Sequence, residues 1–62
     1  MILKKTAEEA AAAKPETGEV YRADTCFGWQ FTPEVETAVF LLQSGAAVQK
    51  LQNHHVRGWE AP

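Results

Sequence analysis

Three side chains could bind a metal ion through sulfur or imidazole nitrogen, namely Cys26, His54 and His55. A structural zinc site uses four such ligands, usually in pairs separated by two to five residues. The adjacent histidines project in different directions from a helix or a strand, so they do not form such a pair. We therefore predict no metal site and no cofactor, and expect the two histidines at a solvated helix end.

Cys26 is also the candidate nucleophile. A reactive thiolate needs a nearby base and positive surroundings, and Arg22 is the one cation close to it in sequence. Glu8, Glu9, Glu34 and Glu36 fall in the first turns of expected helices, where the helix dipole accounts for them. Phosphate-binding and hydrolase motifs are absent from the 62 residues, a length too short to enclose a pocket of roughly several hundred Å³. The sequence predicts no catalytic residue and a protein that is not an enzyme.

Aromatic side chains form the third group that could act in binding. They are enriched in the energetic centres of protein interfaces and can stack on single-stranded bases. Base-stacking surfaces interleave rings with cations, whereas here Asp24 offsets Arg22. We assign most rings to the core and Trp59, isolated near the end, to a partner. The predicted partner-binding residues are Arg22, Gln30, Phe40, Leu41 and Trp59.

An alternating pattern positions most of these rings. Between Tyr21 and Phe31 the odd-numbered residues include four aromatics and the even-numbered residues are mainly polar, which indicates a strand or hairpin. After a two-residue hairpin turn, the residues that face the core would change from odd-numbered to even-numbered positions. If the four rings share one face, the segment is either one strand kinked at Gly28 or a hairpin whose turn has an odd number of residues.

Helix signals flank this segment. Residues 6–14 combine a Thr6-x-x-Glu9 capping box with alanines, and Pro15 follows them. Thr32 and Pro33 predict a helix with Thr32 at the N-cap and Pro33 in the first helical position. A predicted buried stripe with helical spacing comprises Val35, Ala38, Val39 and Leu42.

The apolar residues beyond Gly45 would lie opposite this stripe on a continuous helix. We therefore expect either a break at Gly45 that gives two short helices, or an unbroken helix whose second apolar face is covered by a second subunit. A β-hairpin over residues 38–52 is the alternative that the pattern leaves open.

Together these elements predict a small α+β protein, residues 1–62 forming one domain. An aromatic strand or hairpin (about 19–31) packs on one broken or two short helices (about 33–53), after a short marginal N-terminal helix. We expect residues 1–17 to form a flexible helix and linker, and residues 18–62 to form the core. The net charge is −2 and the longest apolar run has five residues, from Ala38 to Leu42, so we predict no membrane segment and a cytoplasmic location.

We hypothesise a small non-catalytic protein-interaction module, a regulator, inhibitor or accessory subunit that acts through a strand edge between Tyr21 and Phe31 and an apolar helix face. Its expected partners are another protein and a second copy in a homodimer. The alternative is a small dimeric DNA-binding regulator of strand-helix-helix type, which resembles ribbon-helix-helix repressors in element order. In that case Arg22 and Gln30 would project from the outward face of the strand and could contact bases. The lack of a basic cluster argues against nucleic acid.

Overall fold

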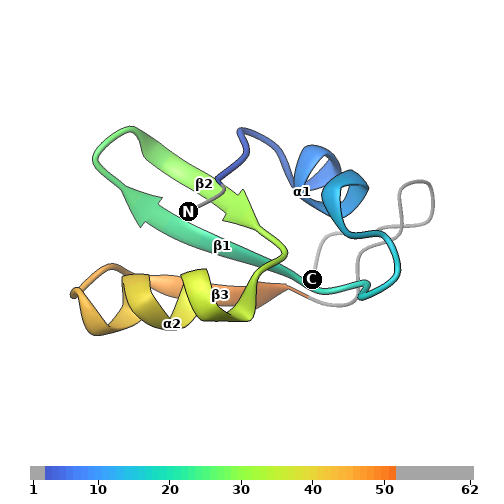
Figure 1. Cartoon of the computed structure of the whole chain (residues 1–62). Helices are drawn as coiled ribbons and strands as arrows, with labels where there is room; N and C mark the ends of the chain where they lie inside the picture. The colour runs from blue at the N-terminus through green and yellow to red at the C-terminus, as the bar shows by residue number, and fades with distance from the viewer. Residues whose placement is uncertain (1–2, 52–62) are drawn as a thin grey trace.

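The computed structural model describes residues 3–51, which form a three-stranded antiparallel sheet and two helices (Figure 1). The order of elements is α1 (Ala7–Ala13), β1 (Val20–Thr25), β2 (Gly28–Thr32), α2 (Val35–Gln43) and β3 (Val48–Leu51). Strand β1 lies in the centre of the sheet, between β2 and β3. The predicted small α+β domain and the hairpin in its aromatic segment are confirmed.

The β1–β2 hairpin turns through two residues, Cys26 and Phe27, because Thr25 pairs with Gly28. Gly28 has a φ of 97°, a left-handed conformation that glycine adopts without a steric penalty. Directly paired residues of antiparallel strands lie on the same face of the sheet. The two-residue turn therefore shifts the odd-numbered residues of β2 to the face opposite the odd-numbered residues of β1.

The prediction that four aromatic side chains share one face is wrong for this reason. Tyr21 lies on the same face as its pairing partner Thr32, whereas Trp29 and Phe31 lie on the opposite face. Phe27, at the tip of the hairpin, is 84% exposed. The alternating pattern is the same for one long strand and for this hairpin, and only the length of the turn decides which residues face each other.

Helix α1 covers the face of the sheet that carries Phe31. Its predicted capping box is confirmed: the Thr6 hydroxyl accepts a hydrogen bond from the Glu9 N–H, and the Glu9 carboxylate accepts one from the Thr6 N–H, both at 3.1 Å. The buried cluster on this face consists of Ala7, Ala10, Ala11, Val20 and Leu51, with Phe31 packed against it. The small alanine side chains let the helix axis approach the sheet closely, so this helix forms part of the core.

Helix α2 lies over the opposite face and begins at Val35, later than the predicted start at Pro33. Thr32 is the last residue of β2 and is fully buried, and its hydroxyl accepts a hydrogen bond from the Glu34 N–H at 3.1 Å. Pairing with Tyr21 keeps the Thr32 backbone in the strand. The hydroxyl thus bonds close to the helix start, but Thr32 is not the N-cap.

The predicted break at Gly45 is confirmed. Gly45 has a φ of 96°, and the N–H groups of Gly45 and Ala46 donate to the carbonyls of Leu42 and Leu41 at 3.1 and 3.0 Å. These are the two hydrogen bonds of the Schellman motif, which ends a helix at a left-handed glycine. The chain then reverses and runs back along β1.

The segment after this break is strand β3, not the expected second helix. Val48 and Leu51 have the three-residue spacing of a helical face, which is why the sequence pattern indicated a helix. In the sheet Val48 pairs with Ala23 on the α2 face, and Leu51 pairs with Val20 on the α1 face. Since the sheet is covered by a helix on both sides, its strands need not alternate apolar and polar residues.

Candidate functional site

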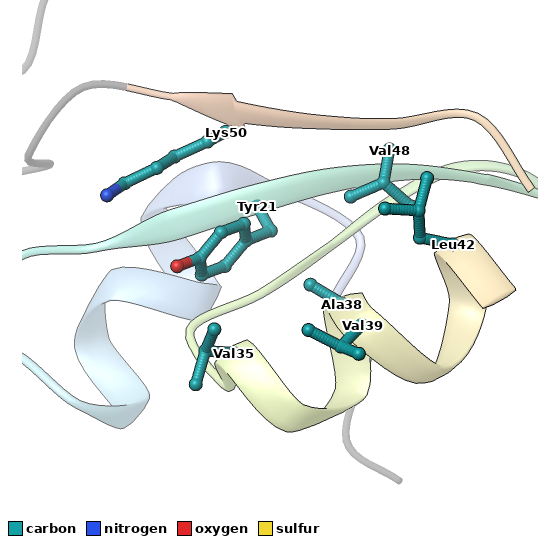
Figure 2. A pocket seen from close by; sticks show the side chains of 7 residues that line it. All are labelled: Tyr21, Val35, Ala38, Val39, Leu42, Val48 and Lys50. Carbon is teal, nitrogen blue, oxygen red and sulfur yellow. The ribbon is translucent and has the colours of Figure 1, made fainter.

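An open apolar groove of about 210 Å³ runs between α2 and the sheet face formed by β1 and β3. Seven residues line it: Tyr21, Val35, Ala38, Val39, Leu42, Val48 and Lys50. Figure 2 shows Leu42 and Val48 at one end of the groove and Tyr21 and Lys50 toward the other. The apolar stripe of α2 therefore faces the sheet, as its spacing predicts, but leaves the groove open.

The stripe is much less buried than the sequence predicts. Ala38 is 4% exposed, whereas Val35, Val39 and Leu42 are 50%, 46% and 58% exposed. Ala38 brings the middle of α2 against the sheet, and the larger side chains on either side of it form the rim of the groove. These half-exposed apolar side chains adjoin one another, so they form a candidate binding surface.

Polar groups close the Tyr21 end of the groove. The Tyr21 hydroxyl donates a hydrogen bond to the Glu19 carboxylate at 3.2 Å, and the Lys50 ammonium lies 3.9 Å from the same carboxylate group. Burial raises the pKa of the Tyr21 phenol above its ordinary value, and the charge and hydrogen bond of Glu19 raise it further. The neutral phenol is thus held as a hydrogen-bond donor to Glu19 at this end of the groove.

One edge of the sheet adjoins the groove. The Asp24 N–H donates to the Ala47 carbonyl at 2.9 Å, so the backbone of Ala47, Gln49 and Leu51 points toward β1. The N–H and C=O groups of Val48 and Lys50 consequently point away from the sheet. Within residues 3–51 no backbone hydrogen-bond partner is found for them.

The opposite edge of the sheet is partly closed. The Lys4 N–H donates to the Phe31 carbonyl at 2.7 Å, and the Phe31 N–H donates to the Lys4 carbonyl at 2.9 Å. The sequence analysis placed the available edge between Tyr21 and Phe31, but β1 is central and β2 is engaged at Phe31. The outward backbone groups of Trp29 on β2 have no such partner among residues 3–51, so β3, with Val48 and Lys50, has the longer open stretch of the two edges.

The predicted partner-binding residues are not brought together. Arg22 lies on the α1 face, where its guanidinium is 4.4 Å from the centre of the Trp29 ring and its Nη2 donates to Gln49 Oε1 at 2.8 Å. Gln30 pairs with Ala23 and so lies on the other face. The expectation that Arg22 and Gln30 project from one face is therefore wrong, for the same reason of turn length.

The two candidates from α2 lie outside the groove lining. Phe40 is 53% exposed and Leu41 is half-buried, and neither lines the groove. Trp59, like His54 and His55, lies outside the described residues. The sequence analysis missed Val48 and Lys50 because it interpreted their segment as helix, and it found the α2 stripe but assigned it to the core.

The remaining candidate chemistry shows no assembled site in the part of the chain that the structure describes. Cys26 is an exposed free thiol in the hairpin turn. No group of three or more His, Cys, Asp or Glu side chains suited to a metal ion is found among residues 3–51.

Neither of the helices described here has the length and apolar character needed to cross a membrane. Comparisons with protein-family models, with curated proteins and with solved structures found no match.

Proposed function

We propose that this chain is a small non-catalytic protein-interaction module. Its binding surface is the groove under α2 together with the outer edge of β3, called here the α2–β3 surface and comprising Tyr21, Val35, Val39, Leu42, Val48 and Lys50. The observation that supports this most directly is the position of an open strand edge beside half-exposed apolar side chains. A sheet edge binds the backbone of an added strand, and adjoining apolar pockets select its side chains.

The partner that fits is a protein segment in extended conformation whose alternate side chains present apolar atoms to the groove. Its backbone would bond to Val48 and Lys50, and the apolar part of one of its side chains would cover Leu42. The shallow, open shape of the groove suits such a segment better than a small ligand, because small-ligand sites enclose most of the ligand surface.

The size of the core supports the same function. Five of the eight buried apolar side chains in the described part are alanines, which contribute little apolar area. A chain of 62 residues buries only about 60% of the surface that its unfolded form exposes and commonly needs a supplement to its core. A bound protein that covers the α2–β3 surface would provide it.

The exposure of Cys26 supports a proposed cellular location for the protein. The exposed thiol of the one cysteine fits a reducing compartment, and we include a cytoplasmic location in the proposal.

No structural observation favours the alternative of a DNA-binding regulator. The segment after Gly45 is strand, so the strand-helix-helix order is not found in residues 3–51. Arg22, which was expected to reach bases, is engaged by Trp29 and Gln49.

A photoreactive benzoylphenylalanine at Leu42 tests the proposal in the cells that make the protein. The matched control carries the same probe at Phe27, which is 84% exposed but lies at the hairpin tip, away from the groove. We expect irradiation to give a discrete covalent adduct with a protein from Leu42 and none from Phe27. Absence of any protein adduct from Leu42 would contradict the proposed function.

A further inference from the structure

We propose that the strand bound at the β3 edge is β3 of a second copy of this chain, paired antiparallel about a twofold axis that passes beside Gln49. This inference rests on the proposed function, whose edge it uses, and names the partner. The two sheets would join into one sheet of six strands, with α2 of both copies on the same face.

Hydrogen-bond geometry limits the possible registers. Within β3, only Val48 and Lys50 direct their N–H and C=O groups away from β1. Hydrogen bonds between two such edges form only where an outward-pointing residue of one copy lies opposite an outward-pointing residue of the other. Twofold pairing within β3 can then centre on Val48, on Gln49 or on Lys50. Centring on Val48 pairs only that residue within the strand, whereas the other two registers pair three residues of each copy.

Charge decides between the two remaining registers. Centring on Lys50 places the two ammonium-bearing side chains directly opposite each other, which destabilises an antiparallel pair. Centring on Gln49 places Lys50 opposite the partner's Val48, where the lysine stem covers an apolar side chain. The exposed Lys50 ammonium, which lies 3.9 Å from Glu19 in the single copy, can then extend past Val48 toward the partner's α2. Gln49 then faces the partner's Gln49, and both are exposed and uncharged.

The same register complements the charge of α2. The end of the groove that carries Val48 also carries Leu42, in the last turn of α2 (Figure 2). That turn contains no basic residue of its own. A cation near a helix C-terminus is favourable, and in this register the partner's Lys50 is beside Val48 and therefore at this helix end. The second copy thus provides both an apolar stem for Leu42 and a cation for the helix end.

Disulfide trapping tests this pairing in the full chain. Residues that face each other in the non-hydrogen-bonded position of antiparallel strands have Cα atoms about 4.5 Å apart, within the range that a disulfide spans. We expect Gln49→Cys, in a Cys26→Ser background, to form a covalent dimer under mild oxidation. The control is Ala12→Cys in the same background, an exposed thiol on α1, which should stay largely monomeric. Equal cross-linking by the two variants would overturn the proposal.

A second variant keeps the test independent of thiol chemistry. Gln49→Lys places like charges opposite each other at the axis and should raise the dissociation constant of the dimer about fivefold, as measured by light scattering against the unsubstituted chain. Gln49→Thr, which adds no charge, should change it much less. A chain of 6.9 kDa that stays monomeric at all concentrations would also overturn the proposal.

These results separate the inference from the function on which it rests. If the Gln49→Cys variant does not cross-link while the Leu42 photoprobe captures a different protein, the second copy is excluded and the interaction module stands. If the Leu42 photoprobe captures no protein, the proposed function itself is contradicted.

Discussion

Replacing Val20 with alanine should lower the free energy of unfolding by about 2–3 kcal/mol. Val20 is fully buried between α1 and the sheet, and it pairs with Leu51. Loss of two buried methyl groups removes about 1.6 kcal/mol of transfer free energy. A residual void of about 20–40 Å³ adds about 0.5–1 kcal/mol, because the backbone of a sheet strand can close only part of the space.

The matched control is Val35→Ala, the same chemical change at a side chain that is 50% exposed. It loses roughly half of the transfer term, leaves no closed void, and gains helix propensity at the first residue of α2, so the net loss should be below about 1 kcal/mol. Urea unfolding followed by circular dichroism, at one protein concentration, measures both variants. Equal losses for the two variants would refute the assignment of Val20 to the core and of Val35 to an exposed surface.

Three further substitutions test local features of the fold. Thr6→Ala removes the capping box of α1 and should cost about 1 kcal/mol in urea unfolding, and an unchanged midpoint would contradict the role of α1 in the core. Gly45→Ala forces a φ of 96° on a residue with a side chain and should cost about 1–2 kcal/mol, whereas Ser44→Ala next to it should cost less. The pKa of the Tyr21 phenol is raised in the folded state, so the phenol of the unfolded chain ionises at a lower pH. The contribution of Tyr21 to the free energy of unfolding should therefore be full below about pH 10 and be lost as the pH rises through the folded-state pKa. Thermal unfolding of the Tyr21→Phe variant should show a smaller decline over that alkaline range, and an equal decline would exclude Tyr21 as its cause.

The features that the sequence predicted correctly are set by neighbouring residues. The Thr6 capping box and the break at Gly45 each depend on hydrogen bonds within one helical turn. The α+β class and the hairpin followed from local periodicity in the same way. Such signals are present in any short window of the chain, so they can be recognised without knowing the rest of the fold.

The features that the sequence analysis missed depend on pairing between segments that are distant in the chain. Only the register of β1 with its two neighbours shows that Tyr21 and Trp29 lie on opposite faces. Residues Val48 and Leu51 had helical spacing, and their assignment to a strand required β1 as an adjacent template.

One of the two parts of the candidate site could be predicted from the sequence. The apolar stripe of α2 followed from its spacing, but whether a stripe is covered depends on the width of the sheet beneath it. Here the sheet has three strands and its edge strand has four residues, which leaves Val39 and Leu42 about half exposed. The sequence indicated an apolar face and not that it would adjoin an open strand edge.

Backbone amide exchange at the β3 edge tests the central claim most directly. The N–H groups of Gln49 and Leu51 point toward β1 and should be protected at every protein concentration. Those of Val48 and Lys50 point outward, and the account predicts that nuclear magnetic resonance will show them protected in concentrated solution and progressively faster to exchange on dilution. Rapid exchange of Val48 and Lys50 at all concentrations, with Gln49 and Leu51 protected, would contradict the claim that a second copy pairs with this edge.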